Sequence, residues 1–142
     1  MRKESSEMDT TGKIAEYLWQ CGVFYMATVR GTHPRVRPMS GVCVYGGKLC
    51  FSVERDSELY SDLRINQRVE IAAMHSDKTW ISLRGTLKEI TDPDSVRTMV
   101  CAGRRCMDDF RRIGSAEPAV FALEYGSVRF CSSTGSAEEF GL

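Results

Sequence analysis

The sequence has no excess of charge, no long apolar run and few potential metal ligands. Nineteen basic residues balance nineteen acidic ones in a chain of 142 residues. This balance argues against nucleic acid or an anionic membrane as a partner, since both attract a positive surface. No stretch approaches the ~20 apolar residues that span a bilayer, and the first nine residues contain no apolar segment of a secretory signal. We therefore expect a cytoplasmic protein with a flexible leader over residues 1–9.

Familiar chemical motifs are also missing. The chain has six cysteines but only two histidines, and no C-x₂-C pair occurs, so we expect no metal site. In a cytoplasmic protein we expect the cysteines to be reduced thiols that pack as small apolar side chains. The sequence contains no G-x-G-x-x-G fingerprint, P-loop or G-x-S-x-G elbow. With no evident general base, a cofactor that supplies the chemistry fits better than a hydrolase.

Most of the chain reads as short strands separated by turns. Runs rich in β-branched and aromatic residues predict strands at 23–29, 35–45, 48–53, 69–74, 79–91, 119–123 and 128–131. The last two are expected to form a hairpin, followed by a polar tail. Capping residues and helical spacing predict helices from about residue 10 to 22, 57 to 66, 93 to 103 and 107 to 113. Because strands do not alternate with long helices, we predict an α+β fold. Its centre is an antiparallel barrel of six to seven strands with three or four short peripheral helices.

The stretch from Arg35 to Met39 carries the first functional signal. Alternate residues of a strand point to the same side, so Arg35 and Arg37 project together while Val36 faces the other way. Two guanidinium groups on one face can hold a phosphate through charge-assisted hydrogen bonds. The alternative is a solvated basic face. Pro38 cannot donate a ladder hydrogen bond, which predicts an edge strand or a bulge here.

A second candidate element is the strand that contains Ser52 and Val53 together with the helix that begins near Ser57. Hydroxyl groups and free backbone N–H groups at a helix N-terminus bind anions. A cleft flanked by Arg37 on one side and by Ser52 and Ser57 on the other could hold a phosphate monoester. The alternative is that Ser57 only caps the helix.

Five motifs follow one another along the chain, at residues 22–29, 34–39, 47–51, 63–71 and 80–85. In this order they resemble the pyridoxamine 5′-phosphate oxidase-like FMN-binding split-barrel family. The similarity covers about residues 12–132. The resemblance implies that residues 10–142 form a single FMN-binding split-barrel domain. It also implies a homodimer with FMN at the shared interface and a small-molecule substrate.

The same resemblance implies roles for individual residues. Arg37, Pro38 and Met39 would lie along the ring and phosphate of FMN, Ser52 and Val53 near the ring and ribityl chain, and Ser57 near the phosphate. Trp80 would form a wall supplied by the second subunit, or else a barrel-core aromatic.

The phosphate-binding part departs from the family pattern. Many relatives carry lysine where this chain has Ser57, and here the nearest cations are Arg55 and the pair Arg35 and Arg37. FMN, another flavin or a deazaflavin are therefore all candidates for the ligand.

These features lead to one functional expectation with two alternatives. We expect an FMN-binding oxidoreductase that passes a hydride or electrons through the flavin to a small substrate. The first alternative is a non-catalytic flavin-binding or electron-carrier protein. The second is a split-barrel haem-binding protein, which would need His33 or His75 as an axial ligand.

Overall fold

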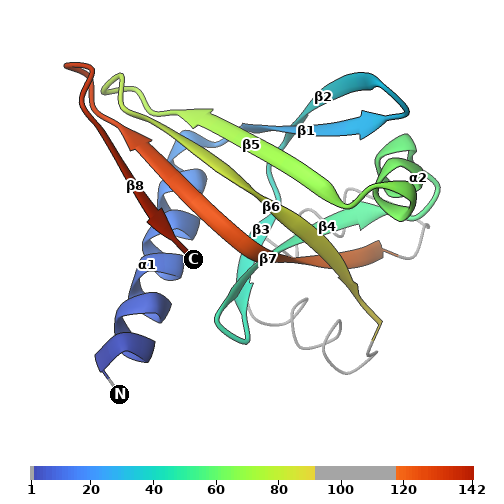
Figure 1. The fold of residues 1–142 in the computed structure, drawn as a ribbon, viewed down its shortest axis with the longest axis horizontal. Coiled ribbons are helices and arrows are strands. Elements are labelled where there is room, and N and C mark those ends of the chain that lie inside the picture. The colour runs from blue at the N-terminus through green and yellow to red at the C-terminus, as the bar shows by residue number, and fades with distance from the viewer. Residues whose placement is uncertain (1, 92–117) are drawn as a thin grey trace.

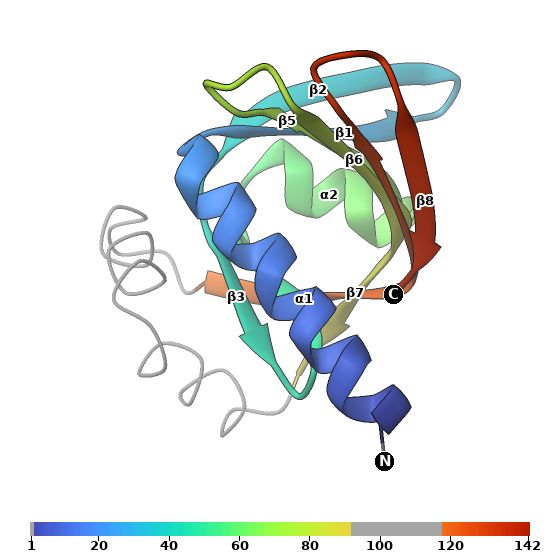
Figure 2. The same cartoon turned by 90° about the vertical axis from the view of Figure 1, so that its left-hand side faces the viewer.

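The computed structural model describes residues 2–91 and 118–142. Their strands form one antiparallel sheet in the order β2-β1-β5-β6-β7-β4-β3, with β8 paired to β7. The strands are β1 Phe24–Arg30, β2 His33–Met39, β3 Val42–Tyr45, β4 Lys48–Glu54, β5 Arg68–Met74, β6 Trp80–Ile90, β7 Pro118–Cys131 and β8 Ala137–Gly141. The sheet curls into a barrel (Figures 1 and 2) but β2 and β3 stand at its two ends. The predicted α+β split barrel is therefore confirmed.

Two helices accompany the sheet in the described residues, α1 Arg2–Cys21 and α2 Glu58–Ile65. In Figure 2, α1 crosses one end of the barrel. Both helices contribute to the core, which buries Leu18 of α1 and Leu63 of α2 together with Phe24, Phe51 and Phe121 of the strands. Each such side chain stabilises the fold by roughly 1.5–3 kcal/mol. No helix in these residues is long and apolar enough to cross a membrane. The helices predicted at 93–103 and 107–113 lie outside the described residues.

The first helix is longer than the sequence suggested. It begins at Arg2 rather than at a cap near residue 10, so residues 2–9 are helical where we expected a flexible leader. These eight residues include Arg, Lys, Glu and Met, which favour helix, and they contain no glycine or proline that would stop it. The predicted end at Gly22 is correct. Gly22 has a φ of 82° and its N–H donates to the carbonyls of Leu18 and Trp19.

The predicted strand over 35–45 is two strands. β2 ends at Met39 and β3 begins at Val42, so residues 40 and 41 separate them. Among the strands of the described residues, β2 pairs only with β1 and is an edge strand, as Pro38 indicates. The hairpin from β3 to β4 turns at Gly46 and Gly47, whose positive φ angles of 59° and 77° match the turn that a Gly-Gly pair favours.

The predicted hairpin over 119–131 is wrong. β7 runs unbroken from Pro118 to Cys131 and pairs with β6 on both sides of Tyr125. Instead of a turn there is a bulge. Tyr125 takes a φ of 53°, and the register with β6 shifts opposite Gly85. The close approach requires glycine there, because a Cβ on Gly85 would lie 2.9 Å from the carbonyl oxygen of Glu124.

The chain after β7 also differs from the expected polar tail. It turns back through Gly135, whose φ is 96°, and forms β8 alongside residues 127–131 of β7. All five β8 residues are exposed. Strands are recognised in sequence by an apolar face, which explains why this one was missed.

The cysteines do not all behave as expected. Cys43 is disulfide-bonded, which corrects the expectation that it is a reduced thiol. Cys21, Cys50 and Cys131 carry free thiols. Spacing along the chain does not show which cysteines meet in the fold, so the sequence could not reveal this bond.

Candidate functional site

The arginines of β2 point to the inner side of the edge strand. Arg35 and Arg37 are partly buried and both contact Asp62 of α2, whereas Val36 between them is 69% exposed. The prediction that the two arginines share a face is therefore confirmed. This face turns toward α2, which packs against β1 and β4 (Figure 1).

Asp62 is the centre of a buried ionic network. Its Oδ1 accepts a hydrogen bond from Arg30 Nε at 2.7 Å. Its Oδ2 accepts from Arg37 Nη2 at 3.1 Å and from Thr28 Oγ1 at 3.2 Å, and lies 3.3 Å from Arg35 Nε. Arg37 Nη1 also donates to Thr28 Oγ1 at 3.0 Å. The side chain of Asp62 has no exposed surface, so three hydrogen-bond donors and the charge of Arg35 replace the water it loses.

The charge states in this network follow from its geometry. Burial alone would raise the pKa of Asp62, but the hydrogen bond and charge of Arg30, with Thr28 and Arg35, bring that pKa below its ordinary value. Burial lowers the pKa of Arg37, and the Asp62 carboxylate opposes that shift. A guanidinium does not lose its proton in proteins. Asp62 is therefore an anion, and Arg37 a cation, at neutral pH.

The start of α2 is held by Ser57. Its Oγ accepts the Tyr60 N–H at 3.2 Å and donates to the Glu54 carbonyl at 2.6 Å, so Ser57 is the N-cap of the helix. The first turn leaves the N–H groups of Glu58 and Leu59 without partners inside the helix. Glu58 itself is an acidic residue in this turn and pairs with Arg35.

A cavity of about 350 Å³ lies where the end of β2, the end of β4 and the start of α2 meet. Six of the nine residues selected from the sequence line this cavity: Arg37, Pro38, Met39, Ser52, Val53 and Ser57. Four further lining residues were not selected: Ser40, Gly41, Glu54 and Leu59. Two segments that are 11 residues apart in sequence, 37–41 and 52–59, thus meet around one space, as the cleft between Arg37 and the Ser52–Ser57 segment requires.

The other three selected residues do not line this cavity. Arg35 is directed at Asp62 and Glu58. Arg55 donates to Tyr60 Oη and to Glu89 Oε2, both at 3.2 Å. Trp80 is the first residue of β6, in the middle of the strand order, where it pairs with Met74 and Cys131.

The two histidines lie elsewhere as well. His33 is exposed at the start of β2. The ring of His75 contacts the ring of Tyr17 in a tilted arrangement, with 5.6 Å between the ring centroids. Neither lines the cavity. A haem in this cavity would therefore lack a histidine ligand from the same chain.

Sequence reasoning missed Asp62, the residue that organises the arginines. One signal was present. Asp62 lies between buried Leu59 and Leu63 on the inner side of α2, where a carboxylate is stable only when it is paired. The three arginines at positions 30, 35 and 37 are its partners.

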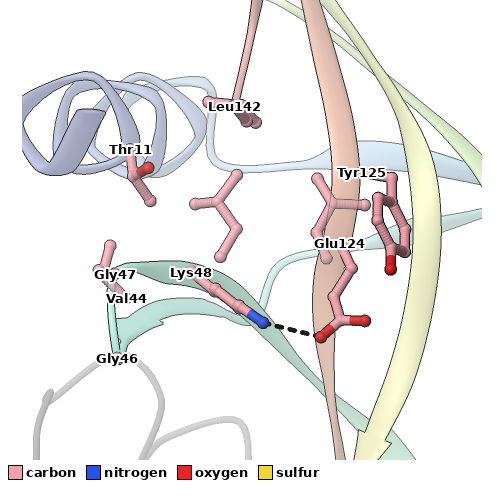
Figure 3. A pocket seen from close by; sticks show the side chains of 10 residues that line it. Thr11, Val44, Gly46, Gly47, Lys48, Glu124, Tyr125 and Leu142 are labelled. Carbon is pink, nitrogen blue, oxygen red and sulfur yellow. Dashed lines mark hydrogen bonds and ion pairs between the residues drawn. The ribbon is translucent and has the colours of Figure 1, made fainter. Parts of the chain in front are cut away.

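A larger cavity of about 780 Å³ lies elsewhere, between α1, the β3–β4 hairpin, β7 and the last residue of the chain (Figure 3). Its charged groups neutralise each other, because Lys48 Nζ and Glu124 Oε1 are 2.7 Å apart. None of the residues selected from the sequence lines it. Size alone therefore does not identify the functional site.

Comparison with known families agrees with the motif order along the chain. The sequence profile described as pyridoxamine 5′-phosphate oxidase matches residues 10–132. The chain belongs to the pyridoxamine 5′-phosphate oxidase family. No curated protein sequence matches it.

Solved structures show how this family member relates to other split barrels. A NimC/NimA family protein from Clostridium acetobutylicum is 28% identical with a TM-score of 0.85, over 99% of this chain and 98% of that one. General Stress Protein 26 from Bacillus anthracis is 14% identical with a TM-score of 0.69, over 95% of this chain and 98% of that one. A haem-binding protein from Mycobacterium smegmatis is 18% identical with a TM-score of 0.69, over 89% of this chain and 57% of that one. The latter two show the fold alone.

Proposed function

We propose that the chain binds FMN in the cavity between β2, β4 and α2, and that it is a flavin-dependent oxidoreductase acting on a small substrate. The observation that carries the proposal is the convergence of Arg37, Pro38, Met39, Ser52, Val53 and Ser57 on one cavity. Membership of the pyridoxamine 5′-phosphate oxidase family supports the same ligand class.

The cavity suits a flat, mostly apolar ring. Its volume of about 350 Å³ is within the range of small-molecule sites, roughly 300–1,000 Å³. Pro38, Met39, Val53 and Leu59 supply apolar walls. Ser52 and Arg37 add hydroxyl and guanidinium groups that can bind the polar edge of the ring. A few polar groups among apolar walls are typical of such sites.

The flavin and the residues of the cavity would have different roles in the reaction. A bound flavin supplies the hydride or electron transfer. The apolar walls would keep water from one part of the ring, and Arg37, fixed by Thr28 and Asp62, would hold a positive charge beside it. No histidine lines this cavity, so none from the same chain is proposed to move a proton there.

The proposed homodimer uses the outer side of the sheet. On β1, β2 and β5 this side carries exposed apolar residues, with Tyr25 at 51%, Val36 at 69% and Met74 at 59% exposure. Tyr25 is directly opposite Pro38, which lines the cavity. The apolar surface therefore adjoins the proposed flavin site. Exposed apolar surface of this kind often marks an interface with another protein.

The test of flavin binding is a titration of the purified protein with FMN, followed by quenching of flavin fluorescence. The variant Ser52→Phe places a large side chain in the cavity, and we expect FMN to bind at least about tenfold more weakly. The matched control Ser127→Phe makes the same change at an exposed strand position outside the cavity. Equal affinity of wild type and Ser52→Phe would remove the cavity as the FMN site.

A second measurement separates an enzyme from a carrier. The protein saturated with FMN is mixed anaerobically with NADH or NADPH, and the flavin absorbance is followed. Reduction that turns over with an added electron acceptor supports an oxidoreductase. Bound flavin that neither nucleotide reduces would favour the non-catalytic carrier instead.

A further inference from the structure

The cations near the cavity are already paired with carboxylates of the protein itself. Arg30, Arg35 and Arg37 all contact Asp62, and Arg35 also pairs with Glu58. Arg55 binds Glu89. In a site that holds phosphate, two or more such guanidinium groups would be free to form charge-assisted hydrogen bonds with its oxygens.

A ligand cannot easily displace Asp62 from the arginines. Its carboxylate is fully buried and is held by Arg30 at 2.7 Å, Arg37 at 3.1 Å, Thr28 at 3.2 Å and Arg35 at 3.3 Å. A phosphate that took over these donors would leave a buried, unpaired carboxylate, which is strongly unfavourable. Asp62 thus takes up Arg30 Nε, Arg35 Nε and Arg37 Nη2 and neutralises part of the positive charge that a phosphate would need.

Three features at the start of α2 also disfavour an anion. The Ser57 hydroxyl is engaged with Tyr60 N and the Glu54 carbonyl. Glu58 lies in the first turn of α2, where a negative charge already stabilises the helix dipole. Glu54 lines the cavity. Around this site there are thus four arginines, at positions 30, 35, 37 and 55, and four carboxylates, at positions 54, 58, 62 and 89, so these formal charges sum to zero.

We propose that the cavity holds flavins through the ring rather than through the 5′-phosphate, so that riboflavin binds nearly as well as FMN. This inference rests on the proposed flavin site. Asp62 and Glu58 then determine ligand choice by neutralising the arginines that a phosphate would use. The apolar walls formed by Pro38, Met39 and Val53 provide the affinity.

The experiment measures Kd for FMN and for riboflavin on the full chain, by fluorescence quenching at one low ionic strength. We expect the two values to differ by less than about tenfold. A site that formed two charge-assisted hydrogen bonds with the phosphate would favour FMN by about a hundredfold or more. A preference for FMN of tenfold or more overturns the inference and leaves the proposed function intact. If neither flavin binds, the proposed function itself fails.

A variant tests the role of the carboxylates. Replacement of buried Asp62 destabilises the fold, so the variant is Glu58→Gln, whose side chain is 68% exposed. We expect FMN to bind about three- to tenfold more tightly while the Kd of riboflavin stays unchanged, because only FMN carries the phosphate charge. The control Glu70→Gln removes an exposed carboxylate that pairs with Arg84 and lies outside the cavity. If Glu58→Gln changes neither affinity, or changes both equally, Glu58 does not oppose the phosphate and the inference is wrong.

Discussion

Replacing Asp62 by asparagine is expected to destabilise the protein strongly at neutral pH. The asparagine side chain has the same shape but no charge, and its amide group would face guanidinium donors that now bind the carboxylate. Arg30, Arg35 and Arg37 would lose their shared counter-ion. Removing one member of a buried ion pair costs about 3–5 kcal/mol.

The structure places the expected loss at the lower end of that range. Asparagine keeps one oxygen acceptor, and the arginine side chains are between 21% and 43% exposed, so they can turn partly toward water. A loss of about 3 kcal/mol is a large share of the roughly 5–15 kcal/mol that stabilises a domain. For a chain of this size it lowers Tm by about 10 °C.

The loss should depend on pH in a defined direction. The pKa of Asp62 in the folded protein is below the ordinary value of 3.8. The stabilisation by its charge is therefore complete above that ordinary value and is lost as the pH falls through the lower, folded-state pKa. The difference in stability between wild type and Asp62→Asn should stay constant from about pH 5 to 8 and shrink below about pH 4.

The assay is urea unfolding followed by circular dichroism at a series of pH values. The control Glu70→Gln removes a carboxylate from an exposed ion pair, with Glu70 55% exposed, and should cost less than about 1 kcal/mol. A loss below about 1 kcal/mol for Asp62→Asn at pH 7 would refute the reasoning. So would a difference that persists unchanged to pH 2.

Three further predictions concern other parts of the fold. Val36→Glu should convert a dimer to a monomer in analytical ultracentrifugation and weaken FMN binding. The control Ile65→Glu changes another exposed apolar residue and should do neither. A dimer that persists in Val36→Glu would exclude this surface as the dimer interface. Gly85→Ala should lower stability by about 1–3 kcal/mol because its Cβ would meet the Glu124 carbonyl oxygen at 2.9 Å. Gly12→Ala, in α1 with open space around it, should raise stability by about 0.5–1 kcal/mol; urea unfolding that shows the same sign for both changes would contradict this. Burial raises the pKa of Cys50 to about 11, so iodoacetamide at pH 8 should leave it unmodified in the folded protein, and peptide mass spectrometry showing rapid native-state alkylation would disagree.

The sequence predicted those elements whose signals are local. Gly46 and Gly47 favour one hairpin turn, Ser57 caps α2, and Gly22 ends α1; all three appear as expected. Pro38 correctly indicated an edge strand. In each case a single residue type fixes the nearby backbone through its allowed φ or through one hydrogen bond.

The elements that the sequence predicted wrongly depend on pairing between distant segments. Tyr125 and Gly126 resemble a turn in isolation, yet β6 continues to pair beyond them and Gly85 accommodates the bulge. β8 is stabilised by its pairing with β7 and has no apolar face of its own. Propensity is a weak guide where such tertiary pairing decides the conformation.

The candidate site also combines a feature that local sequence signals predict with one that they do not. Alternation along a strand placed Arg35 and Arg37 on one side, but nothing local showed that Asp62 would meet both. The sequence predicts that these arginines bind a ligand phosphate, and the structure shows in addition that they bind a carboxylate of the protein. A buried acidic residue on the inner side of a short helix is the signal to search for in related sequences.

A crystal structure of the protein with FMN tests most directly whether the cavity between β2, β4 and α2 is the flavin site. We expect the ring to lie against Pro38, Met39 and Val53, with Asp62 still bound to the three arginines. A flavin found instead in the larger cavity beside Lys48 and Glu124, or displacing Asp62 from Arg37, would contradict this.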